Sequence, residues 1–301
     1  MIRRTLLGLL VAFAACAEIP ETSDPFAGFS RPKKAGGGPR LRTIVSDVDT
    51  PGYQNREIAD NFALVIGIEK YSALPQADFA ERDAASVRRH LLAMGYPDRN
   101  VILLTGKDAG LAGIEKYAES WLPRNTTEAS KVFVYFSGHG APSAESGQAY
   151  LVPWDGDPQF LEATAYPLKR LYERLGQLKA KSVIVAMDAC FSGAGGRSVM
   201  APGTRPLVGK TDVGVGRSDK LTILAAAGPE EITGGDDSQG HGIFTYYLLK
   251  ALAAKQGQAT AQGVFDFLSP KVRDAARRQN REQTPQILSA GGSLPSPRLD
   301  R

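Results

Sequence analysis

A histidine and a cysteine each follow an apolar run and lie close to glycine. These two side chains can act as a thiol nucleophile and its base. His139 lies in S-G-H-G over residues 137–140, and Cys190 lies in D-A-C-F-S-G over residues 188–193. A nearby imidazole can help form a thiolate and later protonate a leaving amine. The backbone amides of Gly140 and Cys190 are candidates for stabilising an oxyanion. These residues predict nucleophilic catalysis at a carbonyl carbon.

The elements that would position this pair are predicted by apolar periodicity. Unbroken runs rich in β-branched residues are typical of parallel strands covered on both faces. They occupy residues 62–68, 101–104, 132–136, 182–187 and 221–227. Patterns with steps of three and four predict helices near residues 84–94, 111–121, 168–178, 243–252 and 264–276, with Pro270 kinking or starting the last. The sequence therefore predicts an α/β fold with a mostly parallel central sheet flanked by helices, and a site beyond the carboxyl ends of its strands.

The composition narrows the possible function classes. The chain has 301 residues, with 36 Lys and Arg against 32 Asp and Glu, and 43% of its residues are hydrophobic. These values exclude disordered, fibrous and polytopic membrane proteins, and the small positive excess predicts no nucleic-acid partner. Two cysteines exclude a disulfide framework, and three histidines argue against a multi-histidine metal centre, so we expect no metal site.

The first 16 residues have the pattern of an export signal. Arg3 and Arg4 precede an apolar run over residues 6–15, which is too short to span a bilayer. The run ends F-A-A-C over residues 13–16, which is similar to a bacterial lipoprotein cleavage site with Cys16 as the lipidated residue. We expect a cell-envelope lipoprotein on the periplasmic side of a membrane, with the outer membrane favoured by Ala17, and plain secretion as the alternative.

The domain boundaries follow from changes in composition. Residues 17–60 are rich in Pro, Gly and charge without an apolar period, which predicts a flexible tether. Residues 61–290 carry the alternating strand and helix patterns of one domain. Within it, residues 194–219 are rich in Gly, Arg and Lys and predict a loop, and residues 291–301 form a tail.

The order of motifs resembles the caspase-like cysteine peptidases, the group of caspases, metacaspases and their bacterial relatives. The resemblance rests on S-G-H-G and D-A-C-F-S-G, with support from R-D-A over residues 82–84, Y-L-V-P-W-D over residues 150–155 and G-I-F-T over residues 242–245. It implies a three-layer caspase-like sandwich in which Cys190 is the nucleophile and His139 the general acid/base. It also implies an oxyanion hole of the Gly140 and Cys190 amides, and peptide hydrolysis through an acyl-enzyme.

The same resemblance implies which residue the enzyme prefers before the cleaved bond of its substrate. Metacaspases cut after Arg or Lys, and they carry acidic residues at the positions of Asp83 and Asp188 and a pocket residue at Ser137. Two carboxylates would select a cationic side chain of a protein or peptide substrate. Phe191 stands where metacaspases have His, so the chain looks like a bacterial variant. Calcium activation, known in some metacaspases, is not supported, because few acidic residues follow Cys190; no cofactor is expected.

Other interpretations of these residues remain open. The chain can be a catalytically silent caspase-like binding module at the cell envelope. Asp83 can cap or charge a helix start, and Asp188 can bond neighbouring amides. The loop over residues 194–219 falls where caspase-like enzymes join their large and small subunit regions, and it is either a self-processing site or simply a loop. His90 is expected to be solvated, and His241 is expected to have a structural role in a Gly-rich turn.

Overall fold

The structure is a computed structural model that describes residues 44–143, 146–192, 218–228, 230–289 and 298–299. The predicted signal peptide, Cys16, residues 17–43 of the predicted tether, the loop at 193–217 and most of the predicted tail lie outside these residues. No helix among the described residues is long and apolar enough to cross a membrane.

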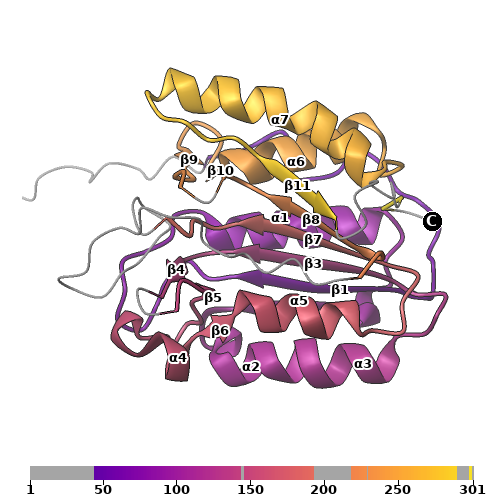
Figure 1. Cartoon of the computed structure of the whole chain (residues 1–301). Coiled ribbons are helices and arrows are strands. Elements are labelled where there is room, and N and C mark those ends of the chain that lie inside the picture. Colours follow the sequence, from indigo (N-terminus) through magenta and orange to yellow (C-terminus); the bar gives the residue numbers. More distant parts are fainter. Residues whose placement is uncertain (1–43, 144–145, 193–217, 229, 290–297, 300–301) are drawn as a thin grey trace, which may run out of the picture. The chain divides into compact units, whose positions relative to one another are not determined.

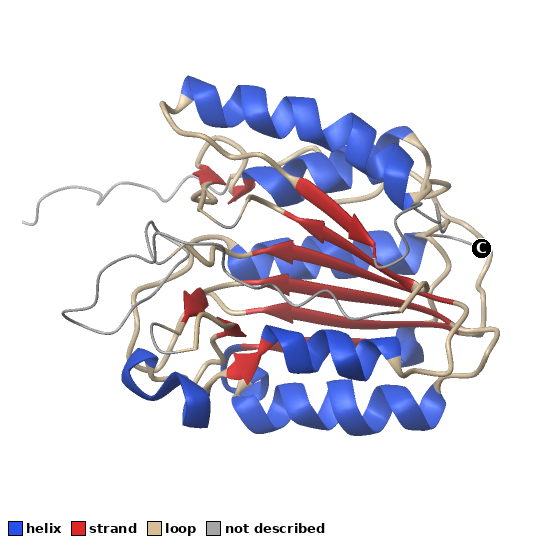
Figure 2. Cartoon of the chain, in the orientation of Figure 1, coloured by secondary structure: helices blue, strands red, loops and turns tan. Residues whose placement is uncertain are grey.

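A six-stranded sheet forms the centre of the domain, and five of its strands lie at the predicted apolar runs (Figures 1 and 2). Its order is β11-β8-β7-β3-β1-β2, and all neighbours pair in parallel except β11, which is antiparallel to β8. The strands are β1 (Asn61–Gly67), β2 (Val101–Thr105), β3 (Lys131–Ser137), β7 (Ser182–Asp188), β8 (Leu221–Ala225) and β11 (Gln286–Ser289). The predicted mostly parallel α/β fold is confirmed.

Two smaller sheets were not predicted, because strands of two or three residues are too short to show a period. One is antiparallel and contains β4 (Gly140–Pro142), β5 (Ala149–Leu151) and β6 (Tyr166–Pro167). The other is a hairpin of β9 (Gly235–Asp236) and β10 (His241–Gly242). Both follow main-sheet strands along the chain, and Gly140 of β4 and His241 and Gly242 of β10 belong to the site described below.

The five predicted helices are present, with boundaries that differ by a few residues. Pro270 lies inside α7, so the expectation that it starts this helix is wrong; α7 instead begins after Thr260, whose hydroxyl accepts from the amide of Gly263. The second predicted helix is a run of three segments with a π-helix in its middle. The α-helices are α1 (Ala80–Ala93), α2 (Leu111–Glu115), α3 (Leu122–Asn125), α4 (Leu161–Thr164), α5 (Leu168–Gly176), α6 (Ile243–Ala254) and α7 (Ala261–Arg278), with π-helix η3 (Lys116–Trp121) and 3-10 helices η1 (Asp98–Asn100), η2 (Gly106–Ala109) and η4 (Pro158–Phe160).

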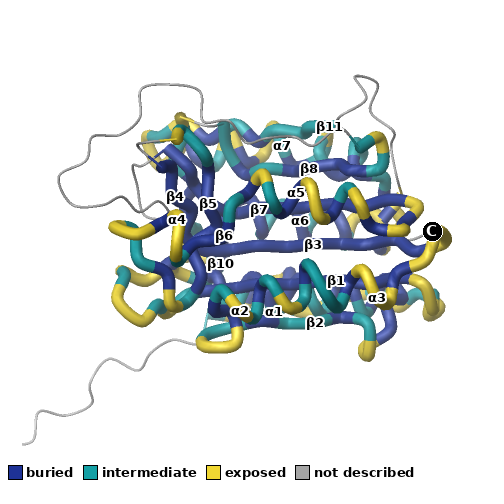
Figure 3. Tube along the Cα trace, turned by 60° about the horizontal axis from the view of Figure 1, so that its bottom comes forward, coloured by how far each residue is buried: buried dark blue, intermediate teal, exposed yellow. Residues whose placement is uncertain are grey.

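The sheet separates two apolar cores, because alternate side chains of each strand point to opposite faces. Val134 and Phe136 of β3 pack with α2, α3 and α5, whereas Phe133 and Tyr135 pack with α1, α6 and α7. Strands β1, β3 and β7 are buried along their whole length (Figure 3). Gly67 lets α1 lie directly on β1, since an added Cβ there would stand 2.4 Å from the carbonyl oxygen of Ala80.

Residues 44–60 correct the expected extent of the tether. They belong to the same compact unit as the domain, and Val48 is only 1% exposed within the core beside α1 and α6. Asp49 accepts hydrogen bonds from the Arg82 guanidinium, and Asp47 pairs with Lys250. The compact unit therefore includes residues 44–60, which precede the boundary expected at residue 61. Periodicity did not reveal this segment, because charged contacts and one buried valine hold it.

His90 also differs from the expectation, since its side chain is buried rather than solvated. Its Nε2 donates to the carbonyl of Val48 over 2.9 Å, and its Nδ1 lies 3.0 Å from the hydroxyl of Tyr53. These partners suit the neutral ring, with one nitrogen donating and the other accepting. Burial lowers the pKa of His90 from 6.5 to about 4, against the opposing effect of the bond to Val48.

The depressed pKa of His90 predicts a pH-dependent stability. The unfolded chain binds a proton at His90 below about pH 6.5, whereas the folded chain binds it only near pH 4. Protonation of His90 therefore leaves the free energy of unfolding unchanged above pH 6.5 and lowers it as the pH drops towards 4. The loss is about 3 kcal/mol for this group. In urea denaturation at pH 7 and pH 4.5, His90→Gln should show a smaller drop than the wild type. An equal drop in both proteins would contradict the assignment.

Candidate active site

The predicted catalytic residues follow the carboxyl ends of two adjacent parallel strands. Ser137 of β3 and Asp188 of β7 are partners in the strand register, and His139 and Cys190 each stand two residues further on. The amide of Gly138 donates to the carbonyl of Asp188 over 3.5 Å. A Cβ added to Gly140 would lie 2.4 Å from the carbonyl oxygen of Cys190. The structure thus brings the two segments together at one edge of the sheet, and glycine at 140 allows their close approach.

The imidazole of His139 is held in one tautomer. Its Nε2 lies 2.8 Å from the carbonyl oxygen of Pro75, and a carbonyl only accepts, so Nε2 carries the proton and Nδ1 is the basic nitrogen. Tyr71 lies against the ring, with centroids 4.6 Å apart and planes inclined by 32°. The Tyr71 hydroxyl also accepts from the backbone amide of His139 over 2.6 Å. Tyr71 therefore orients both the ring and the backbone of His139.

The thiol of Cys190 is buried, with 1% of the residue exposed. Its sulfur donates to the carbonyl of Glu231 over 3.0 Å and lies 3.0 Å from the hydroxyl of Ser192. The carboxylate of Glu231 in turn accepts from the amides of Gly228 and Thr284, which anchors this segment after β8. A sulfur that donates to a carbonyl carries its proton, so nucleophilic attack from this arrangement requires that proton to move.

The three predicted pocket residues are also brought together, and all are fully buried. The hydroxyl of Ser137 donates to Oδ2 of Asp83 over 3.3 Å. Asp188 stands beside Ser137 in the strand register. The side chains of Ser137 and Asp188 share the sheet face of Tyr135, which is the face covered by α1, the helix of Asp83.

Both carboxylates lie at the N-terminus of α6. The amide of Gly242 donates to the two oxygens of Asp83 over 3.2 and 3.1 Å. The amide and hydroxyl of Thr245 donate to Oδ2 of Asp188 over 3.3 and 2.8 Å. Because unpaired amides and the helix dipole favour negative charge at this end, α6 stabilises both carboxylates. The G-I-F-T motif supplies these donors, so the expectation that Asp188 bonds amides agrees with the contacts.

Sequence reasoning missed three residues of this site. Tyr71 lies on a loop after β1, and no pattern marks it. Asp49 lies in the segment assigned to the tether. His241, expected to have only a structural role in a turn, is fully buried and contacts both Asp49 and Asp83. The position of His241 directly before G-I-F-T was the one available signal.

Comparison with known proteins now identifies the domain. A family model described as the caspase domain of peptidase family C14 matches residues 60–292. The chain belongs to the caspase domain family. Its fold is therefore of the cysteine-peptidase type, with peptides or proteins as the family's substrates.

A crystal structure of a protein from Geobacter sulfurreducens shows the same fold, with a TM-score of 0.58 and 17% identity. That similarity covers 80% of this chain and 97% of the Geobacter chain. No curated protein matches the sequence.

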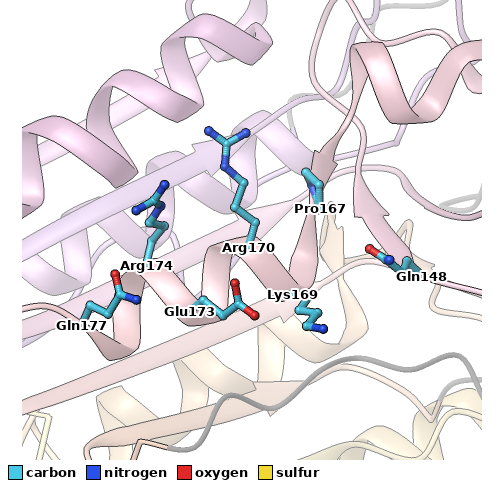
Figure 4. A pocket seen from close by; sticks show the side chains of 7 residues that line it. All are labelled: Gln148, Pro167, Lys169, Arg170, Glu173, Arg174 and Gln177. Atoms are coloured by element: carbon cyan, nitrogen blue, oxygen red, sulfur yellow. The ribbon is translucent and has the colours of Figure 1, made fainter. Parts of the chain in front are cut away.

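Other features of the described residues do not join this site. No group of three or more acidic, histidine or cysteine side chains among the described residues could hold a metal ion. A surface pocket of about 520 Å³ lies along α5, where Arg170 and Arg174 extend from one side of the helix (Figure 4). Both arginines pair with Glu119, which is on η3. The pocket contains none of the predicted site residues. The oxyanion role of the Gly140 and Cys190 amides stays a prediction.

Because Tyr71 orients His139, the predicted base for Cys190, removing the Tyr71 hydroxyl should lower the reactivity of the Cys190 thiol. Tyr71→Phe keeps the ring against His139 but removes the acceptor of the His139 amide, a bond with a net contribution of about 1 kcal/mol. Alkylation of Cys190 by iodoacetamide near pH 7, followed by mass spectrometry, should slow about fivefold. Tyr166→Phe is a matched control, since the Tyr166 hydroxyl donates to Glu119, which belongs to none of the site contacts. Equal slowing in both variants would contradict the positioning role.

Proposed function

We propose that the protein is a cysteine endopeptidase that cleaves after Arg or Lys, with Cys190 as nucleophile and His139 as general acid/base. The observation that carries the proposal is the meeting of these residues beyond neighbouring parallel strands. The hydrogen bond from His139 to Pro75 supports it, because the bond makes Nδ1 the basic nitrogen. The match to the caspase domain supports the cysteine-peptidase part of the proposal.

The chemistry follows in balanced steps. The thiol proton passes to Nδ1 of His139, and the sulfur attacks the substrate carbonyl carbon to form a tetrahedral oxyanion. His139 then gives the proton to the leaving amine as the C–N bond breaks, which leaves a thioester on Cys190. Water hydrolyses the thioester, with His139 taking one proton from the water and returning it to the sulfur. The amides of Gly140 and Cys190 are proposed to stabilise the oxyanion.

The pocket residues carry the proposed preference for basic side chains. Asp83, Asp188 and Ser137 lie together beside the catalytic segments, and two carboxylates at one place favour a cationic side chain. An Arg side chain can bind a carboxylate through two parallel hydrogen bonds. This preference also supports placing the chain with the metacaspase-like members of the family, as a bacterial variant.

A panel of fluorogenic peptides ending in Arg, Lys or Asp, with and without calcium, tests this function. Cleavage after Arg or Lys should vanish in Cys190→Ala and fall about 100-fold in Asp188→Ala, because a charge-assisted pair in the pocket is lost. Cleavage after Asp would keep the fold and overturn the specificity. Absence of all cleavage, with Cys190 alkylated no faster than an ordinary thiol, would favour the silent binding module.

We further propose that the protein is an exported lipoprotein anchored through Cys16. The pattern of residues 1–16 supports this proposal. Cys16→Ser should move the protein from the membrane fraction to the soluble fraction of the cells and abolish incorporation of labelled palmitate, because the sulfur that carries the lipid is lost. Palmitate incorporation that persists in the variant would contradict the proposal.

A further inference from the structure

His241 is a buried histidine that contacts a carboxylate at each ring nitrogen. It lies in β10 directly before α6, and none of the residue is exposed. Its Nδ1 is 2.8 Å from Oδ1 of Asp83, and its Nε2 is 3.2 Å from Oδ1 of Asp49. An ionised carboxylate only accepts hydrogen bonds, so two ionised partners require both ring nitrogens of His241 to donate.

His90 provides an internal comparison for this charge assignment. It is equally buried and also contacts the N-terminal segment, but its partners are the carbonyl of Val48 and the hydroxyl of Tyr53. A hydroxyl can donate, so a neutral ring satisfies both contacts, and burial lowers the pKa of His90 to about 4. The two buried histidines thus differ in the kind of partner, and only His241 lies between two acids.

Asp49 is itself held as an anion, although burial opposes this. Its Oδ2 accepts from Arg82 over 2.6 Å and from the amide of Ser46 over 2.9 Å. Burial raises the pKa of Asp49, but the contacts with Arg82, Ser46 and His241 outweigh it and lower the value to about 2. Arg89 adds a second cation 3.7 Å from Oδ1. The N-terminal segment therefore presents a fixed negative charge to the outer nitrogen of His241.

The position of Asp83 does not depend on His241 alone. The amide of Gly242 and the hydroxyl of Ser137 both donate to the Asp83 carboxylate. These neutral donors would hold the carboxylate in place without the imidazole. What a doubly donating His241 adds is a positive charge in contact with Asp83, whose partner Ser137 is paired in register with Asp188. A cation there reduces the repulsion between two buried acids.

We propose that His241 is the internal counter-ion of Asp83 and that it weakens the charge preference of the substrate pocket. In its presence the side chain of a basic substrate meets less net negative charge than two bare carboxylates would offer. Asp49 makes the N-terminal segment part of the specificity apparatus by holding the ring. The inference rests on the proposed function, and it makes His241 a positioning and specificity-determining residue rather than a catalytic one.

The kinetic test compares peptides that are identical except for Arg or its uncharged isostere citrulline before the cleaved bond. The measured quantity is the ratio of their kcat/KM values at pH 8. His241→Gln should raise this ratio about tenfold, because Asp83 loses its cationic partner in a site of low effective dielectric. His90→Gln, the same substitution at the other buried histidine, should leave the ratio within twofold of the wild type. A ratio that is unchanged or lower in His241→Gln, or raised equally in His90→Gln, would overturn the proposal.

A second measurement does not depend on activity or on the folding of a variant. The chain has only three histidines, so long-range ¹H–¹⁵N spectra of the wild-type imidazoles can be assigned. In the assay buffer, His241 should show protons on both ring nitrogens, and His90 should show one. A single proton on the His241 ring would overturn its assignment as a counter-ion. If the wild type cleaves neither peptide, the proposed function fails, while this spectrum still decides the charge of His241.

Discussion

The N-terminus of α6 lies against two buried carboxylates, and the arrangement of the site depends on this contact. Asp83 comes from α1 and Asp188 from β7, and both accept hydrogen bonds from the first residues of α6. Burying two acids side by side without donors would be costly, since desolvation and mutual repulsion both oppose ionisation. The helix terminus supplies amides and a favourable dipole, and Thr245 adds a hydroxyl that also contacts Tyr135 of β3. The contact therefore joins both chain halves around the sheet edge.

The same two strands place the catalytic pair and the candidate pocket. In β3 and its extension, Ser137 and His139 are two residues apart, and Asp188 and Cys190 have the same spacing after β7. The pairing of β3 with β7 therefore positions both sets at once. A shift of β7 by one residue would place Met187 or Ala189, instead of Asp188, beside Ser137. The backbone pairing of β3 with β7 thus links the catalytic residues to the pocket residues, and no direct contact between their side chains is needed.

A line of polar contacts leads from the candidate pocket to residues 44–49. Asp83, His241, Asp49 and Arg82 form one line of contacts from α1 to the N-terminal segment and back to α1. Val48 is the one buried apolar side chain of the segment over residues 44–49, so its attachment is mainly electrostatic and depends on cations of α1 and α6. A segment that precedes the family match is therefore structurally part of the site.

The sequence itself determined the fold class and marked His139 and Cys190 as candidate catalytic residues, and its resemblance to caspase-like peptidases pointed to the candidate pocket residues. Five apolar runs of strand length and the helical periods between them are local patterns, and parallel strands place their following residues at one edge. The two small sheets, β11 and the extent of α7 escaped prediction because their pairing partners or capping contacts decide them. Local patterns also could not predict which residues surround each candidate side chain. Only the tertiary structure placed Tyr71 on His139 and His241 between Asp49 and Asp83, because these contacts join residues that are distant in the chain and single polar side chains carry no period.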